Sequence, residues 1–218
     1  PRRHVYPWVD LQPDGMLRSI YTGEEYDPED FIREDARIDR ERAARLSERL
    51  ARESTIDLAE TVDALEAALP YNCEHVVPQS WFAKHEPMRG DLHHLFACES
   101  RCNSFRGNTP YFEFPEFDEA LRPGCGMIEN DRFEPSHGKG TAARAGCYFL
   151  LRYPGEISRA EGYDEDRLAL LLEWHRQEPP GDYERHRNAA IFEISGNRNP
   201  LIDHPDWAEK IDFAAGLG

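Results

Sequence analysis

Residues able to move protons and to bind metal ions are concentrated in the middle of the chain. The stretch from Asn72 to Tyr111 contains four of the nine histidines, and within it Glu74 directly precedes His75. Imidazole titrates near neutral pH, so His75 can take a proton from a water molecule. Carboxylate and amide oxygens are ligands that Mg²⁺ prefers, which makes Glu74 and Asn103 candidate metal ligands. Because Mg²⁺ keeps several waters, two protein ligands are enough for such a site.

Three short elements must position these side chains. Residues 73–77 are β-branched at their end and are followed by a proline, which is typical of a strand that runs into a loop. Residues 92–96 suit a second strand, and residues 99–107 suit a helix that ends at a glycine. Neighbouring side chains of a strand point to opposite faces, so Glu74 and His75 reach one site only where the strand twists or ends. The sequence therefore predicts a strand, a second strand and a helix that close around one divalent metal ion.

The segments on either side of this stretch are predicted to be mostly helical. Composition and periodicity favour helices over residues 29–53, 57–69, 141–152, 164–177 and 182–194. Three further segments are interpreted as an extended, partly packed arm, an irregular surface segment and a hydrogen-bonded corner: residues 1–30, 111–140 and 196–205.

Length and composition fit one domain with a hydrophobic core. The chain has 218 residues, and the 11% that are aromatic argue against disorder. The longest apolar runs, such as residues 168–172, are far shorter than the ~18 residues that a membrane span needs, so we expect no membrane partner. The chain begins at Pro1 without Met, which we interpret as a processed or trimmed product.

The net charge is the feature least favourable to nucleic-acid binding. It is −16, whereas binding to phosphates needs basic surface. The charge is uneven, because residues 24–69 carry 15 acidic and 7 basic side chains while residues 136–152 carry no acidic side chain. Local basic patches can bind what the net charge repels. We therefore expect Lys139, Arg144 and Arg101 to contact nucleic-acid phosphates.

The five cysteines leave the disulfide pattern open. Cys98 and Cys102 lie four residues apart and can share a helix face. Cys125 and Cys147 can pair across a loop. Spacing alone does not give the connectivity, so neither pair is assigned.

Two other functions use the same cysteines. In the first, Cys73, Cys98 and Cys102 join nearby histidines as zinc ligands of a non-catalytic binding module, although structural zinc sites favour paired C-x-x-C motifs. In the second, Cys73 and His75 form the nucleophile and base of a hydrolase. Two residues on one strand do not supply the orienting third group that this chemistry needs, so the second alternative is the weaker one.

Four motifs in order resemble the endonuclease I family, a branch of the ββα-metal (HNH-like, His-Me finger) nucleases. They read EHVVPQSWF, DLHHLF, NSFRGN and WHRQEPPGDYERHRNAAIFEISGNRNPLIDHPDW. The resemblance extends from about Leu17 to Trp207, nearly the whole chain. It implies an α+β fold, mostly helical, in which one domain over residues 1–218 embeds a small ββα-metal core at residues 72–111.

The resemblance also implies an activity and roles for individual residues. The expected activity is a metal-dependent, non-specific endonuclease that hydrolyses DNA, with RNA as a second substrate, and leaves 5′-phosphate products. His75 matches the general base, and Glu74 and Asn103 match the ligands of Mg²⁺, with Mn²⁺ or Ca²⁺ as substitutes. Asp91, His93 and His94 are expected to hold His75 or the hairpin from behind.

An arginine is expected beside the reacting phosphate, because a guanidinium is always charged and binds two oxygens at once. Arg106 and Arg89 are both candidates, and the sequence does not choose between them. The family also implies a secreted or periplasmic location, and we expect a monomer.

Overall fold

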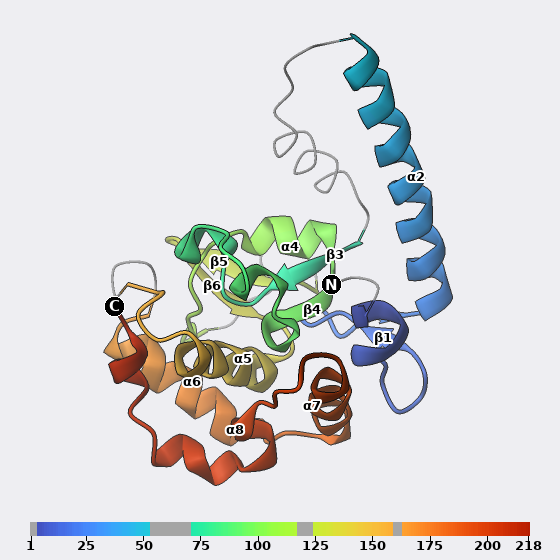
Figure 1. Ribbon diagram of the computed structural model, residues 1–218. Coiled ribbons are helices and arrows are strands. Elements are labelled where there is room, and N and C mark those ends of the chain that lie inside the picture. Colours follow the sequence, from blue (N-terminus) through green and yellow to red (C-terminus); the bar gives the residue numbers. More distant parts are fainter. Residues whose placement is uncertain (1–3, 53–70, 117–123, 159–162) are drawn as a thin grey trace.

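The computed structural model describes residues 4–52, 71–116, 124–158 and 163–218 (Figure 1). In these ranges no helix combines the length and the apolar character that crossing a bilayer requires. The helices are α2 (Pro28–Arg52), α4 (Ser100–Arg106), α5 (Lys139–Arg152), α6 (Glu165–Gln177), α7 (Asp182–Ser195) and α8 (Pro200–Asp203). The strands are β1 (Leu17–Arg18), β2 (Glu25–Tyr26), β3 (Tyr71–His75), β4 (Leu95–Glu99), β5 (Gly126–Glu129) and β6 (Arg132–Pro135). Short turns of helix are η1 (Val5–Val9), η2 (Gln79–Phe82), η3 (Met88–Gly90), η4 (Leu92–His94), η6 (Pro205–Glu209) and η7 (Phe213–Gly216).

The central hairpin pairs β3 with β4 in antiparallel register, so that Glu74 lies opposite Phe96 and His75 opposite Leu95. Helix α4 begins at the residue after β4. The predicted order of strand, strand and helix is therefore confirmed. The second strand begins later than predicted, because the Asp91 side chain accepts a hydrogen bond from the His93 backbone N–H and caps the short turn η4.

Four of the five predicted helices are confirmed as α2, α5, α6 and α7, and the prediction for residues 57–69 lies outside the described residues. Helix α5 is buried along most of its length, as its apolar composition predicts. It packs against α6 on one side, and its Phe149 ring contacts Phe82 and His94 at centroid distances of 5.3 and 5.1 Å. In Figure 1 α2 extends away from the body of the molecule, and α5 lies between the central hairpin and α8.

The N-terminal arm is more ordered than predicted. It contains the hairpin β1–β2, and its Asp10 is fully buried. Asp10 accepts hydrogen bonds from the Ala97 backbone N–H at 2.7 Å and from Arg187 Nε at 2.8 Å. Arg187 in turn donates to the carbonyls of Leu92 and Leu95. The arm and α7, which are far apart in the sequence, thus both form hydrogen bonds with the backbone of β4.

The segment predicted to be irregular contains the hairpin β5–β6. Asn130 and Asp131 turn it, with φ angles of 50° and 55°. Two consecutive positive φ angles define the type I′ turn that two-residue hairpins prefer, and Asn and Asp tolerate them. The Asn-Asp pair is a hairpin signal that our interpretation of the sequence missed.

The structure settles the disulfide pairing that the sequence left open. Cys102 of α4 forms a disulfide with Cys125, with a Cα–Cα distance of 5.3 Å. Cys98 in β4 and Cys147 in α5 are buried free thiols. The pairing joins α4 to the segment before β5, a contact between parts of the chain that spacing cannot reveal.

The turn at residues 196–205 is a hydrogen-bonded corner, as predicted. The Asn199 side chain accepts from the Leu201 backbone N–H at 3.0 Å and caps α8. Asn188 exchanges two hydrogen bonds with the Asn199 backbone, and the Asn199 amide donates to the Arg144 carbonyl. These bonds fix α8 against α5 and α7.

Candidate active site

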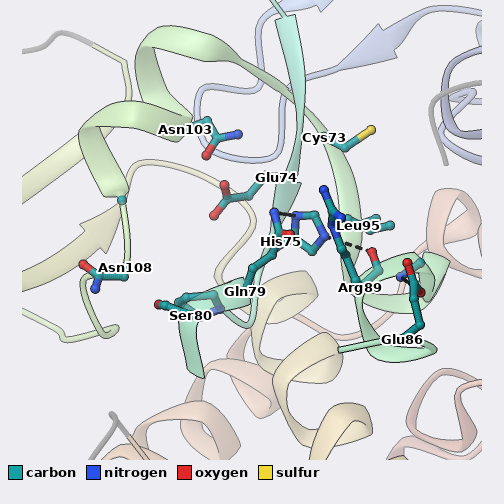
Figure 2. Close-up of a pocket in the computed structure, with 13 residues that line it drawn as sticks. Cys73, Glu74, His75, Gln79, Ser80, Glu86, Arg89, Leu95, Asn103 and Asn108 are labelled. Carbon is teal, nitrogen blue, oxygen red and sulfur yellow. Dashed lines mark hydrogen bonds between the residues drawn. The ribbon is translucent and has the colours of Figure 1, made fainter. Parts of the chain in front are cut away.

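A cavity of about 400 Å³ opens where β3 ends, between the loop at residues 86–90 and the C-terminal end of α4 (Figure 2). Its walls combine charged, amide, hydroxyl and imidazole groups. They are formed by Cys73, Glu74, His75, Pro78, Gln79, Ser80, Glu86, Arg89, Gly90, Leu95, Asn103, Gly107 and Asn108. Glu74 and His75 both line it, and β3 ends at His75, two residues before the end of the predicted strand 73–77.

The His75 ring is held from both sides. Its Nε2 lies 3.0 Å from the backbone oxygen of Arg89, and its Nδ1 lies 3.3 Å from Nε2 of Gln79. A carbonyl only accepts, so Nε2 carries the proton and Nδ1 keeps its lone pair. Burial, followed by the neighbouring His94, lowers the pKa of His75 to about 3. At neutral pH the ring is therefore uncharged, with Nδ1 in the form that can accept a proton.

Glu74 is almost fully buried in the wall of the cavity. Its Oε1 accepts hydrogen bonds from the Tyr21 hydroxyl at 2.7 Å and from Arg106 Nη1 at 3.1 Å. Both bonds end on Oε1, which leaves Oε2 for the cavity. Burial raises the pKa of Glu74 to about 7, and the positive charge of Arg106 opposes this rise only in part. The protein alone therefore does not fully offset the cost of burying the negative charge of the carboxylate.

Asn103 comes from α4 and lines the same cavity half-exposed. In Figure 2 its amide and the Glu74 carboxylate lie on one side of His75, while Arg89 and Glu86 lie on the other. The structure thus brings together the predicted base and both predicted ligands. Within the described ranges no group of three or more His, Cys, Asp or Glu side chains is arranged to hold a metal.

The two candidate arginines occupy different places. Arg89 lines the cavity. Arg106 is 1% exposed and lies behind Glu74, where it also donates to the carbonyls of His75 and Val76 at 3.0 and 2.8 Å. Its guanidinium is therefore committed to the protein and does not face a substrate. Of the two candidates that the sequence left open, Arg89 is therefore the one that lines the cavity, whereas Arg106 holds the carbonyls at the end of β3.

Asp91, His93 and His94 lie outside the cavity lining and support it. Asp91 Oδ2 accepts from the hydroxyls of Tyr148 and Tyr153 at 2.9 and 2.7 Å. The ring of His94 packs edge-on against that of His75 at a centroid distance of 5.4 Å. Of the three, His94 thus contacts the ring of His75, whereas Asp91 joins the turn before β4 to α5.

The predicted phosphate contacts are engaged elsewhere. Arg144 is 2% exposed and forms two hydrogen bonds with the Glu184 carboxylate, so its assignment to nucleic-acid binding is wrong. Lys139 Nζ pairs with the buried Glu134 at 2.6 Å. Arg101 is exposed but pairs with Glu24 at 3.1 Å. None of the three lines the cavity.

Two residues that contact the catalytic candidates were missed. Tyr21 comes from the N-terminal arm, about fifty residues before Glu74, and no local pattern connects the two. Gln79 follows His75 by four residues, inside the motif EHVVPQSWF. An amide so close to a candidate base is a signal that the sequence did offer.

Both cysteine-based alternatives lose support in this geometry. Cys102 is locked in a disulfide and is not a thiolate ligand for zinc. Cys73 and His75 both line the cavity, but the two ring nitrogens of His75 bond to Arg89 and Gln79. Neither nitrogen is therefore paired with the thiol.

Comparison with known proteins identifies relatives. The extracellular ribonuclease of Bacillus subtilis (strain 168) is 36% identical over 160 residues, which cover 65% of this chain and 54% of the ribonuclease. The periplasmic deoxyribonuclease of Aeromonas hydrophila is 28% identical over 153 residues, covering 60% of this chain and 62% of that enzyme. An extracellular deoxyribonuclease of the same organism is 28% identical over 121 residues, 53% of this chain and 50% of that enzyme. The matched part is thus under two thirds of the length of each relative.

The sequence profile of one family, described as Endonuclease I, matches residues 49–206. The matched range contains the central hairpin, α4, the cavity residues and helices α5 to α7. The chain belongs to the endonuclease I family.

Proposed function

We propose that this protein is a metal-dependent endonuclease that hydrolyses phosphodiester bonds with His75 as its general base. One observation carries the proposal: the Arg89 carbonyl fixes the proton on Nε2 of His75, so Nδ1 is the unprotonated nitrogen and lies beside Gln79 in a cavity shared with Glu74 and Asn103. The relatives are named as ribonucleases and deoxyribonucleases, so we propose DNA and RNA as substrates and no sequence preference.

The cavity fits one divalent cation of the Mg²⁺ type. Glu74 offers Oε2 and Asn103 an amide oxygen, and hard oxygen donors with room for several waters are what Mg²⁺ requires. Burial penalises the charge of Glu74, and a cation would offset that penalty. When bound there, the ion would polarise a phosphate oxygen and stabilise the negative charge of the leaving group. On this proposal β3, β4 and α4 are the ββα-metal core that the sequence predicted.

The protein's own groups have separate tasks. His75 removes a proton at Nδ1 from the water that attacks phosphorus, and its Nε2–H stays on the Arg89 carbonyl throughout. The Arg89 side chain faces the same cavity and supplies a permanent positive charge to a non-bridging phosphate oxygen. Arg106 holds Glu74 and the carbonyls at the end of β3, and so positions two members of the site at once. Cleavage on the 3′-oxygen side would leave 5′-phosphate products.

We also propose a secreted or periplasmic location. The relatives are named extracellular and periplasmic. The Cys102–Cys125 disulfide supports this location, because disulfides persist in oxidising compartments.

The test is nicking of supercoiled plasmid DNA, and cleavage of a structureless RNA, by wild type, His75→Ala and His85→Ala. His85 is a matched control because it is an exposed histidine of the same stretch that does not line the cavity. We expect cleavage by wild type and His85→Ala with Mg²⁺, and none in EDTA or by His75→Ala. Cleavage that survives in His75→Ala would overturn the general base. Inert wild type with Mg²⁺, Mn²⁺ and Ca²⁺ would overturn the nuclease, and bound zinc would then be measured.

A further inference from the structure

A second cavity, of about 450 Å³, lies beside the first and shares two residues of its wall, Glu86 and Gly90. Its remaining walls come from the end of α5, the end of α7 and the N-terminal arm. In Figure 2 Glu86 lies on the side of His75 opposite Asn108. The two cavities therefore adjoin along the segment 86–90, on the side of His75 away from Asn108.

The walls of the second cavity suit a flat, partly apolar group. Pro87, Leu92 and Ile194 provide apolar surface. Tyr153 provides an aromatic ring, and the guanidinium carbon of Arg152 lies 5.5 Å from the centre of that ring. Nucleobases stack on aromatic rings and on guanidinium planes regardless of their sequence, because every base has a π-face.

Polar groups at one end can meet the edge of such a ring. Asn197 lines the cavity, and one N–H of its amide donates to the Tyr148 hydroxyl while its Oδ1 accepts from Ser195. An amide nitrogen carries two hydrogens and an amide oxygen two lone pairs, so each keeps capacity for a second bond. Ser195 lies next to it with a hydroxyl that can accept. These groups match the mixed donors and acceptors of a base edge.

The same walls disfavour a phosphate or a metal ion. Two acidic residues, Glu86 and Asp91, line the cavity, and their charge repels phosphate. Asp91 is also a poor metal ligand, because one of its oxygens accepts from the His93 backbone and the other from two tyrosines. An uncharged ring with polar edges fits this environment better than either ion does.

We propose that this cavity binds a nucleobase of the substrate, one or two nucleotides from the scissile phosphate. The inference rests on the proposed nuclease function, because the shared wall is what brings a strand to it. Such a site binds the substrate through a base and does not depend on attraction to phosphates. It therefore suits a chain with a net charge of −16, which repels phosphates.

Ile194 offers a test that leaves the candidate active site untouched. It is 40% exposed and lines the second cavity, whereas Phe192, two residues earlier on α7, is 50% exposed and does not. Ile194→Trp should fill the cavity, and Phe192→Trp adds similar bulk outside it. Melting temperatures of both variants check that the fold is kept.

The measurement is equilibrium binding, in EDTA, of a 5′-phosphorylated thymidine tetranucleotide and of the matching tetramer without bases. For wild type and Phe192→Trp we expect the tetranucleotide to bind about 10-fold or more tightly, since one stacked base is worth ~1–3 kcal/mol. For Ile194→Trp we expect the two affinities to agree within about 2-fold. Equal affinities in wild type, or a preference for bases that survives in Ile194→Trp, would overturn the inference.

Plasmid nicking with Mg²⁺ separates this inference from the proposed function. If wild type nicks DNA but binds the two tetramers equally well, the proposed nuclease function is supported and the proposed nucleobase site is contradicted. If wild type binds the tetramer with bases more tightly, Ile194→Trp does not, and wild type never nicks DNA, the proposed nucleobase site is supported and the proposed nuclease function is contradicted.

Discussion

Gln79 Nε2 lies 3.3 Å from His75 Nδ1, the same ring nitrogen that must accept a proton if His75 is the base. The Gln79 amide therefore occupies the position that a reacting water needs. Its own Oε1 is buried without a hydrogen-bond partner in the described part of the chain. Gln79 thus supports the neutral ring and its tautomer, and Nδ1 can take a proton from water only after this amide moves aside.

Gln79→Glu is expected to move the acid limit of activity to higher pH. A carboxylate cannot donate to Nδ1, and it stabilises the protonated ring, which raises the pKa of His75. A protonated His75 cannot act as a base, so the acid limb of the cleavage profile should move to higher pH by about 1–3 pH units. Gln79→Ala removes the hydrogen bond without adding charge and should cost less than about 10-fold, with an unchanged pH profile.

The check is the pH dependence of kcat on a short labelled oligonucleotide for wild type and both variants. An acid limb that stays in place in Gln79→Glu would show that Nδ1 of His75 is not the proton acceptor. Equal losses in the two variants would show that Gln79 only fills space.

Arg106 and Arg89 should separate stability from catalysis. Arg106→Ala leaves buried Glu74 and two carbonyls without their donor, so we expect a loss of about 3–5 kcal/mol in the free energy of unfolding. Arg89→Ala keeps the carbonyl that binds His75, so stability should change little while kcat falls about 100-fold or more.

Urea denaturation measures the first effect and single-turnover cleavage the second. An Arg106→Ala variant as stable as wild type would contradict the positioning role that we give Arg106. An Arg89→Ala variant with full activity would leave the reacting phosphate without its proposed guanidinium.

Local patterns were sufficient to predict much of this fold. Helix α4 before Gly107 and the apolar helix α5 each follow from a few neighbouring residues, and β3 was predicted as a strand although it ends two residues earlier than expected. These elements bring Glu74, His75 and Asn103 to one cavity. That these three residues lie close together was predicted from the order of the motifs along the chain.

Ion-pair partners, the disulfide pairing and the exposure of charged side chains could not be predicted, because they depend on contacts between distant segments of the chain. The partner of Asp10 is Arg187, and the partner of Cys102 is Cys125. The exposure of a charge is equally non-local, since Arg144 looks like a free cation until α7 places Glu184 beside it. Residue type predicts the chemistry of a side chain, but only packing decides whether that chemistry faces solvent.

Acid should destabilise the fold through two buried histidines. Burial is the largest influence on both, and it lowers the pKa of His93 to about 4 and also lowers that of His94. In the unfolded chain both should titrate near 6.5, so the folded state binds fewer protons below that pH. Their contribution is fully present above pH ~6.5 and is lost as the pH falls toward 4. His93 alone should account for about 2 kcal/mol at pH 5.

Chemical denaturation at pH 7 and pH 5 tests this for wild type, His93→Gln and the control His85→Gln. Gln at position 93 can still donate to the Asn197 carbonyl but does not titrate, so the difference between the two pH values should shrink by about 2 kcal/mol. His85 is exposed, and its replacement should leave the difference unchanged. An undiminished difference in His93→Gln would mean that other groups govern the acid transition.

Salt dependence should distinguish the arginine in the cavity from the paired lysine. Each phosphate contact by a cation adds about 1 to the slope of log affinity against log salt. Arg89→Ala should therefore lower the slope for oligonucleotide binding in EDTA by about 1. Lys139→Gln should leave the slope unchanged, because Lys139 is held by Glu134 at 2.6 Å. A reduced slope in Lys139→Gln would restore this residue to the substrate-binding surface.

Asn103 should be required for metal binding and not for folding. It is half-exposed on α4, so Asn103→Ala should change the free energy of unfolding little. Removing one of two protein donors should lower the affinity for Mn²⁺ by at least about 10-fold, measured from the spin-resonance signal of the free ion. Ser104→Ala is the matched control, an exposed neighbour on the same helix outside the cavity lining. An Mn²⁺ affinity that is unchanged in Asn103→Ala would place the metal elsewhere, whereas a loss shared by Ser104→Ala would point to α4 as a whole and not to the amide oxygen.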